Sequence, residues 1–197
     1  MLRIVSAALL LICAGLHADE PAEPATPEQP ALPAAPESSA SPVTEIMSKQ
    51  VDSLYVVVLP MKGSYDQHQA AIGRLLSYLP DTLKVAPIGP PFGRYFNNPM
   101  EATEADLSWE VGMPVEPGTT PALPFEARTL PAGEVAYTTF TGPYENVSNA
   151  WPGVYMWAMS RGYAPAGPPM EIWMGGDGPQ TELRLPISKP ASPSTAP

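Results

Sequence analysis

Few side chains in this sequence could serve as nucleophiles, metal ligands or redox groups. Among 197 residues, Cys13 is the one cysteine, and His17 and His68 are the two histidines. Cys13 and His17 lie in an N-terminal segment that we expect to be removed. The remaining chain then offers no thiol and one imidazole, which excludes disulfides, a cysteine nucleophile, cysteine-based zinc sites and His-cluster metal sites. We therefore expect no metal and no cofactor. Any chemistry must come from carboxylates, tyrosines, hydroxyls or a binding pocket.

Glu171 is the carboxylate whose position in the sequence is most unusual. The segment 170–174 has the composition of a short strand, in which glutamate is disfavoured. Strand alternation places Glu171 and Trp173 on the same face. A carboxylate beside a tryptophan in a partly dry site favours a cationic partner. The alternative is a solvent-exposed glutamate on an edge strand, because most glutamates are exposed.

Aromatic side chains could form the walls of a site around this carboxylate, since an aromatic face attracts a cation within about 6 Å. The candidates, in chain order, are Tyr95, Trp109, Tyr137, Tyr144, Trp151 and Trp173. Core packing is the alternative for most of them. It is the stronger interpretation for Trp109, which is in phase with Val111 and Met113. A lone histidine such as His68 is more often a hydrogen-bonded boundary residue than a catalyst.

The charge balance argues against nucleic acid as a partner. Ten Lys and Arg residues against 20 Asp and Glu residues give a formal net charge of −10. The basic residues are scattered singly, whereas a phosphate-binding surface needs them clustered. We expect no nucleic-acid partner.

The first 18 residues have the pattern of a secretory signal peptide. A basic start at Arg3 precedes an apolar run over 4–16, which is shorter than the about 20 residues needed to span a bilayer. Ala18 marks the expected cleavage site. We expect an exported protein, periplasmic or secreted, with no stable membrane insertion after cleavage. The alternative is an uncleaved N-terminal anchor.

Residues 19–43 read as a disordered linker rich in Pro, Ala and Glu. From Pro21 to Pro36 a proline recurs at every third residue, which is the period of a polyproline II helix. This segment has too few large apolar side chains to form a core, and a semi-rigid spacer is its expected role. Residues 188–197 have a similar composition and are expected to be a disordered Pro-rich tail.

Three sequence blocks recur in the same order within residues 44–187. Gly63-Ser64-Tyr65 matches Gly142-Pro143-Tyr144, the Ala-Pro-Ile-Gly-Pro-Pro run at 86–91 matches 164–169, and 109–115 matches 181–187. This pattern predicts an internal duplication of about 54–115 and 126–187. Aligning the Gly-Pro-Pro blocks makes Gly93 the counterpart of Glu171.

Each half reads as strand, helix, strand, strand. The expected elements are strands at 54–59, 92–96 and 107–113 with a helix at 65–79, then strands at 135–138, 170–174 and 181–187 with a helix at 147–158. Pro152 requires the second helix to kink or to start late, near Trp151. Helices segregated from a mainly antiparallel sheet define an α+β fold.

The blocks from Gly142-Pro143-Tyr144-Glu145 through 167–173 to 181–187 resemble the gyrase-inhibitor-like (GyrI-like) domain, the effector-binding domain of some bacterial multidrug-responsive transcription regulators. The resemblance covers about residues 54–187. It implies two halves packed around a central pocket for flat, apolar and often cationic molecules, with a buried glutamate as counter-charge, which by motif position is Glu171. The sequence departs from the regulators by its signal peptide and by the lack of a DNA-binding region, so a role in transcription does not carry over.

Two functions of different class follow. The first is an exported, non-catalytic binder of hydrophobic molecules, cationic ones among them, in an aromatic pocket that contains Glu171. The alternative is a hydrolase of strained, cyclopropanoid-type toxic molecules, as the resemblance to some stand-alone relatives implies, with Glu171 as general base. A related haem-binding fold, SOUL, is a third interpretation, with His68 as the iron ligand. The sequence names neither a protein partner nor an oligomeric state.

Overall fold

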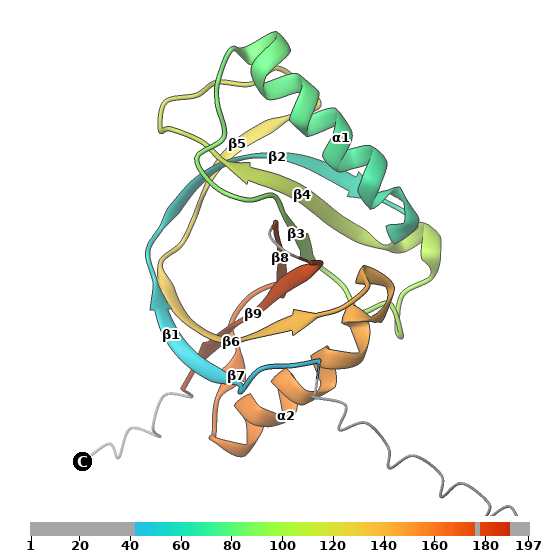
Figure 1. The fold of residues 1–197 in the computed structure, drawn as a ribbon, viewed down its shortest axis with the longest axis vertical. Helices are drawn as coiled ribbons and strands as arrows, with labels where there is room; N and C mark the ends of the chain where they lie inside the picture. Colours follow the sequence, from blue (N-terminus) through green and yellow to red (C-terminus); the bar gives the residue numbers. More distant parts are fainter. Residues whose placement is uncertain (1–41, 176–177, 190–197) are drawn as a thin grey trace, which may run out of the picture. The chain divides into compact units, whose positions relative to one another are not determined.

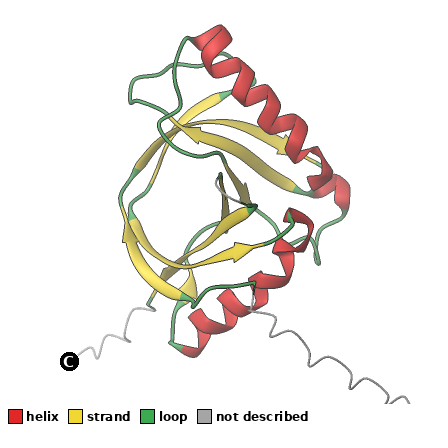
Figure 2. Cartoon of the chain, in the orientation of Figure 1, coloured by secondary structure: helices red, strands yellow, loops and turns green. Residues whose placement is uncertain are grey.

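The structure, a computed structural model, describes residues 42–175 and 178–189. The predicted signal peptide, nearly all of the predicted linker and most of the predicted tail lie outside these residues. Within them, two α-helices cover the outer side of a curled antiparallel sheet (Figures 1 and 2). The predicted α+β class is confirmed. None of the helices in the described part of the chain is long and apolar enough to cross a membrane.

The elements of the two halves include every predicted strand and helix. Those of the first half are β2 (Leu54–Lys62), a 3-10 turn (Tyr65–Gln67), α1 (His68–Tyr78), a π turn (Leu79–Leu83), β3 (Phe92–Tyr95), a 3-10 turn (Glu104–Asp106) and β4 (Ser108–Pro114). Those of the second half are β6 (Gly133–Thr141), a 3-10 segment (Tyr144–Ala150), α2 (Trp151–Ser160), β7 (Ala164–Pro165), β8 (Met170–Met174) and β9 (Gln180–Ser188). Three strands were not predicted: β1 (Met47–Val51), β5 (Glu126–Leu130) and the two-residue β7.

Two proline positions explain where these elements depart from the predicted bounds. Pro152 lies in the first turn of α2, where its missing N–H costs nothing, and the helix accordingly starts at Trp151. Pro60 does not end β2, which continues to Lys62. Beyond Val58, β2 pairs only with β4, so its other edge is open and the absent N–H of Pro60 breaks no ladder there.

The strands of the two halves follow an equivalent order when each half is followed from its outer edge to the centre of the sheet. From edge to edge it is β1-β6-β9-β8-β3-β4-β2-β5, with β7 pairing with β9 outside this path. The pair β3–β8 lies at the centre, and Gly93 is the direct partner of Glu171. The edge strands are exchanged: β1 precedes β2 in the chain but pairs with β6, whereas β5 precedes β6 but pairs with β2.

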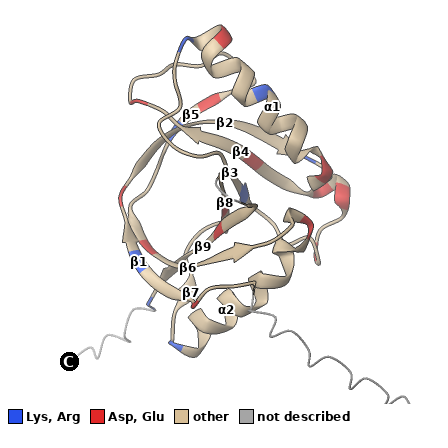
Figure 3. Ribbon diagram, viewed as in Figure 1, with Lys and Arg blue, Asp and Glu red and all other residues tan. Residues whose placement is uncertain are grey.

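Equivalent ion pairs on the inner face of the sheet hold these exchanged strands. Lys49 on β1 contacts Glu182 on β9 at 2.7 Å, and Arg128 on β5 contacts Glu110 on β4 at 3.1 Å. Arg94 adds a second cation to Glu110 at 2.8 Å. Elsewhere Lys and Arg are dispersed over the ribbon and gather in no single stripe (Figure 3).

The helices seal two separate apolar cores on the outer face. Ala71 and Leu75 of α1 pack on β2 and β4 against residues such as Val111. Val154 and Ala158 of α2 pack on β6 and β9. The inner face carries a third, smaller cluster, which includes Val56, Val58, Phe92, Leu130 and Ile172. The central strands β3 and β8 therefore run between two helix-covered cores, and the outer face there is left to polar and aromatic side chains.

Candidate functional site

Glu171 is buried at the middle of β8, with 5% of its surface exposed. Three donors bind its carboxylate. The hydroxyl of Tyr95 donates to Oε2 at 2.7 Å and that of Tyr144 donates to the same oxygen at 2.8 Å. The indole Nε1–H of Trp151 donates to Oε1 at 2.9 Å. The donors come from β3, from the 3-10 segment and from the start of α2, so three separate elements converge on one carboxylate.

A glycine on the neighbouring strand makes room for this arrangement. A Cβ atom on Gly93 would lie 2.9 Å from Cη2 of Trp173 and 3.0 Å from the hydroxyl of Tyr95. Such distances are too short for ordinary contacts, so any side chain at this position would displace one of the two rings. The glycine that the repeat aligns with Glu171 therefore gives the aromatic rings access to the carboxylate.

His68 extends the network on the side of α1. Its Nε2 lies 3.1 Å from the hydroxyl of Tyr95, and its Nδ1 contacts the backbone oxygen of Tyr65. The imidazole also packs against the buried Trp109, with ring centroids 4.3 Å apart. His68 is thus held at both nitrogens and on one face, as expected for a histidine with a fixed tautomer.

Both helices begin at this site. His68 is the first residue of α1 and Trp151 is the first residue of α2. Figure 2 shows the two helices diverging from the same side of the sheet. The N-terminus of a helix carries partial positive charge, so both helix dipoles favour a negative charge at Glu171.

Burial and the carboxylate both act on the tyrosines. Burial, followed by the charge of Glu171, raises the pKa of Tyr95 well above its ordinary value. The same two causes, in the same order, raise the pKa of Tyr144. Both hydroxyls therefore stay protonated at physiological pH and act as hydrogen-bond donors. Burial lowers the pKa of His68 despite the opposing effects of its contact with Tyr65 and of the charge of Glu171.

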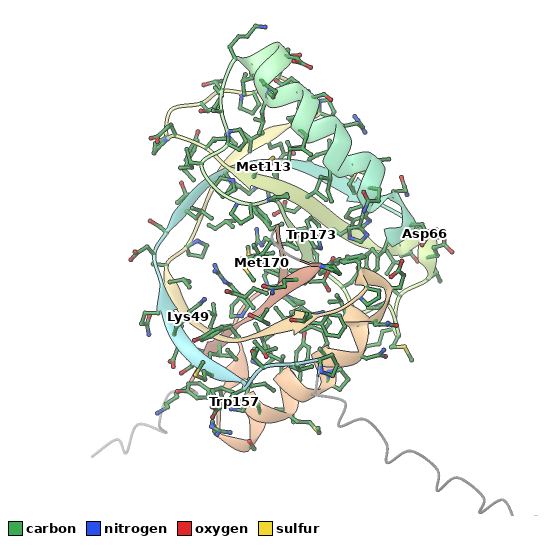
Figure 4. All side chains as sticks on the ribbon, in the orientation of Figure 1. Lys49, Asp66, Met113, Trp157, Met170 and Trp173 are labelled. Carbon is green, nitrogen blue, oxygen red and sulfur yellow. The ribbon has the colours of Figure 1, made fainter. Side chains whose placement is uncertain are left out.

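Five of the residues proposed from sequence lie together: Glu171, Tyr95, Tyr144, Trp151 and Trp173. Trp173 lies between the two halves near the centre of the molecule (Figure 4), with its ring centroid 5.9 Å from that of Tyr144. Its buried Nε1–H has no hydrogen-bond partner among the described residues.

Two of the proposed residues lie elsewhere. Trp109 is 1% exposed, belongs to the core under α1 and donates its Nε1–H to the backbone oxygen of Gly63. It contacts the site through the rings of His68 and Tyr65, which pack against it. Tyr137 lies on the inner face of the sheet, where Lys49 stacks over its ring at 4.0 Å.

The sequence did not predict a place in the site for Tyr65 or His68, and it left Tyr144, like Tyr137 and Trp151, between pocket wall and core. One signal could have found the tyrosines. The repeated Gly-x-Tyr blocks place Tyr65 and Tyr144 just before the two helices, and both rings lie within 6 Å of neighbouring site rings, Tyr65 at 5.1 Å from Tyr95. A tyrosine repeated at the start of both helices indicates a shared position beside the central strands.

The carboxylate lies beneath aromatic rings that are themselves only partly buried, among them Tyr65, Tyr95, Tyr144, Trp151 and Trp173. Two open grooves lie elsewhere, one of about 450 Å³ beside α2 and one of about 480 Å³ beside α1. Within residues 42–175 and 178–189, no group of three or more His, Cys, Asp or Glu residues could hold a metal ion. Within those residues, then, the arrangement consists of a dry, hydrogen-bonded carboxylate under solvent-accessible aromatic faces.

This geometry agrees with a match at the level of sequence families. Residues 44–188 match the model of the GyrI-like small molecule binding domain. The chain belongs to this family. Comparison with curated protein sequences gives no match.

Solved structures show the same GyrI-like fold. The C-terminal domain of EcmrR superposes with a TM-score of 0.63 at 18% identity, over 74% of this chain and 98% of that domain. In the EcmrR–DNA complex the TM-score is 0.64 at 18% identity, and this chain, matched over 74% of its residues, spans 58% of EcmrR. A hydrolase from Listeria innocua, encoded by lin2189, superposes with a TM-score of 0.53 at 14% identity, over 73% of this chain and 92% of the hydrolase. The structure of SAV2435 bound to tetraphenylphosphonium superposes with a TM-score of 0.50 at 13% identity, over 74% of this chain and 94% of SAV2435.

Proposed function

We propose that this GyrI-like protein binds hydrophobic small molecules, cationic ones in particular, over the aromatic rings around Glu171. The observation that carries the proposal is a buried carboxylate whose charge is balanced by hydrogen-bond donors alone. Within the described residues, no Lys or Arg forms an ion pair with Glu171. A bound cation would supply the missing positive charge.

The surrounding rings suit such a ligand. A lipophilic cation placed against a tyrosine or tryptophan face gains cation–π attraction of about 0.5–2 kcal/mol per contact, in addition to the burial of its apolar surface. Tyr144 and Trp151 belong to the 3-10 segment and to the first turn of α2, and both are only partly buried. These two residues form the side from which a ligand can reach the carboxylate.

The fold neighbour SAV2435 was solved with tetraphenylphosphonium, which makes this lipophilic cation a suitable probe. Calorimetric titration should compare tetraphenylphosphonium with an uncharged triaryl compound, triphenylphosphine oxide. Replacing Glu171 by glutamine removes the charge at nearly constant size. We expect affinity for the cation to fall by about 2–5 kcal/mol, as is typical when a buried charge loses its partner, and affinity for the uncharged compound to change far less.

A matched control is available on the next strand. Glu182 is the partner of Ile172, one position along from Glu171, but lies on the inner face and pairs with Lys49. Glu182→Gln removes the same charge from the opposite face and should leave cation binding unchanged. Equal affinity of wild type and Glu171→Gln for the cation would refute the proposal, as would an equal loss in both variants.

A hydrolase is the second candidate, and one observation favours it. Two protonated tyrosines, Tyr95 and Tyr144, donate to the same oxygen of Glu171. A carboxylate beside two hydroxyls can act as general base toward a water while a tyrosine donates to the leaving group, which suits hydrolysis of a strained ring. A water must first displace one of the donors. Turnover of strained cyclopropane-containing compounds that disappears in Glu171→Gln would select this function over simple binding.

The proposal also assigns the protein to the periplasm or the extracellular space, on the basis of the signal-peptide pattern of residues 1–18 and the Pro-rich segment that follows. N-terminal sequencing of protein from the envelope fraction should give a start near Asp19. Recovery of an intact Met1 from the cytoplasm would refute export without affecting the binding site.

A further inference from the structure

The contacts between Tyr65, His68, Tyr95 and Glu171 form a hydrogen-bonded chain. The hydroxyl of Tyr144 joins it as a branch, 3.1 Å from the hydroxyl of Tyr95 and 2.8 Å from Oε2 of Glu171. The hydrogen of Tyr144 lies in neither of the two contacts that Tyr95 makes with His68 and Glu171. Nδ1 of His68 contacts the backbone oxygen of Tyr65, Nε2 of His68 contacts the hydroxyl of Tyr95, and that hydroxyl contacts Oε2 of Glu171. Each of these three contacts needs one hydrogen between its atoms. A backbone oxygen only accepts, so the hydrogen at Nδ1 belongs to the imidazole.

With Glu171 ionised and His68 neutral, the chain has one hydrogen too few. The imidazole supplies the hydrogen at Nδ1, and the single hydroxyl hydrogen of Tyr95 can serve either Glu171 or Nε2 of His68, but not both. The hydroxyl oxygen of Tyr95 then faces a lone pair either on Nε2 of His68, at 3.1 Å, or on Oε2 of Glu171, at 2.7 Å. A buried polar group without its partner is costly. One additional proton completes all three hydrogen bonds.

That additional proton completes the hydrogen bonds from either of two locations. On His68 it makes an imidazolium that donates to Tyr95, while Tyr95 donates to Glu171. On Glu171 it makes a carboxyl group that donates to Tyr95, while Tyr95 donates to His68. The two forms contain the same number of protons and differ by the concerted shift of two of them along the chain.

The other groups near His68 offer no competing site for this proton. Seven residues face it. They are Tyr65 and Asp66 from the 3-10 turn before α1, Tyr95 from β3, Trp109 from β4, Tyr144 from the 3-10 segment before α2, and Glu171 and Trp173 from β8. Asp66 is exposed and Glu171 is buried. Burial disfavours an imidazolium and lowers the pKa of His68.

We infer that His68, Tyr95 and Glu171 share one proton as a unit, and that a cation bound at Glu171 displaces it. This inference rests on the proposed function, and it makes His68 a positioning residue that regulates the site through Tyr95. At pH values at which His68, Tyr95 and Glu171 together hold the additional proton, ligand binding must release that proton. Affinity for a cation then increases with pH by up to about tenfold per pH unit.

The shared proton can be tested without any ligand. In the full chain with ¹⁵N-labelled histidine, the resonances of His68 are identified by their absence in His68→Gln. We expect neutral His68 to carry its proton on Nδ1. We expect Glu171→Gln, and also Tyr95→Phe, to shift proton uptake by His68 to lower pH. Tyr95→Phe keeps every charge in place, so a purely through-space effect of Glu171 would leave the titration of His68 unaltered in that variant.

Tyr55→Phe is the matched control, because Tyr55 donates to the backbone oxygen of Thr119, away from the site, and this variant should titrate as wild type does. An Nε2–H tautomer, or a titration of His68 that is unaltered by Tyr95→Phe, would overturn the shared proton.

The linkage to ligand is tested by calorimetry with tetraphenylphosphonium in buffers of different ionisation enthalpy. Wild type should release up to one proton per ligand bound, and Tyr95→Phe should release close to none. Binding without proton release at any mildly acidic to neutral pH would overturn the linkage. Absence of any binding would refute the proposed function, and the histidine titration would still decide whether the proton is shared.

Discussion

Removing the hydroxyl of Tyr144 should cost a definite and separable amount of stability. Tyr144→Phe keeps the ring contact with Trp173 and deletes the hydrogen bond of 2.8 Å to the carboxylate of Glu171, together with the 3.1 Å contact to the hydroxyl of Tyr95. Hydrogen bonds to charged groups contribute about 1.5–3 kcal/mol. We therefore expect the free energy of unfolding to fall by that amount, which corresponds to a decrease in Tm of roughly 3–12 °C for a domain of this size.

A double-mutant cycle shows whether the loss comes from this contact. In a Glu171→Gln background the same hydroxyl bonds a neutral group, and its removal should cost only about 0.5–1.5 kcal/mol. The coupling energy between the two positions should then be about 1 kcal/mol. Urea unfolding followed by tryptophan fluorescence measures all four proteins of the cycle.

Tyr155 provides the control for this cycle. It lies on α2, packs against Trp151, and its hydroxyl makes no hydrogen bond within the described residues. Tyr155→Phe should change the free energy of unfolding by less than about 0.5 kcal/mol. If Tyr144→Phe costs no more than Tyr155→Phe, the hydroxyl of Tyr144 does not hold the carboxylate, and the argument fails.

Three further outcomes follow from the packing and charges. Gly112→Ala should lower the free energy of unfolding by about 1–3 kcal/mol in a urea titration, because the ring of Phe92 occupies the position of the added Cβ. Gly93→Ala should displace the ring of Trp173 or that of Tyr95 and weaken tetraphenylphosphonium binding in calorimetry; unchanged affinity would exclude these rings from the site. Burial acts to raise the pKa of Glu182, but hydrogen bonds and charges from its two basic partners outweigh it and lower that pKa from the ordinary 4.5. The contribution of Glu182 to the free energy of unfolding is therefore complete above pH 4.5 and is lost as pH falls through the lowered pKa. In Glu182→Gln, the free energy of unfolding should therefore decrease less steeply as the pH is lowered.

The sequence related two residues of the central strands to each other, although it did not predict that these strands pair. Aligning the Gly-Pro-Pro blocks made Gly93 the counterpart of Glu171, and the two residues are direct partners across β3 and β8. The late start of α2 at Trp151 followed from the backbone chemistry of Pro152. These features depend on local chemistry or on alignment within one chain.

The exchange of β1 and β5 could not be predicted, because no local pattern specifies a distant partner. The segment 47–51 is short and largely exposed, and it lacks the apolar alternation of a strand that faces a core. The face on which Tyr137 lies was ambiguous for a related reason. Both faces of β6 are covered, so Val135, Ala136 and Tyr137 give no alternation from which to assign inside and outside.

The network at Glu171 was predicted only in part. Strand parity placed Trp173 on the same face as the carboxylate, but the three hydrogen-bond donors come from elements distant in sequence. Their convergence depends on how the two helices start beside the central strands. The hydrogen bonds of His68 depend on the same packing, which its position in the sequence does not show.

The most direct test of the account is to observe the indole protons of the protein as the probe cation is added. Trp151 donates its Nε1–H to Glu171, whereas Trp157 on the same helix stacks with Tyr163 and Arg161, away from the carboxylate. Tryptophan-to-phenylalanine variants assign each indole resonance in a ¹H–¹⁵N spectrum. We predict that tetraphenylphosphonium shifts the Nε1–H resonance of Trp151 in wild type, leaves that of Trp157 in place, and shifts neither in Glu171→Gln. A shift of Trp157 alone, or the same shift of Trp151 in both proteins, would contradict the assignment of Glu171 as the partner of a bound cation.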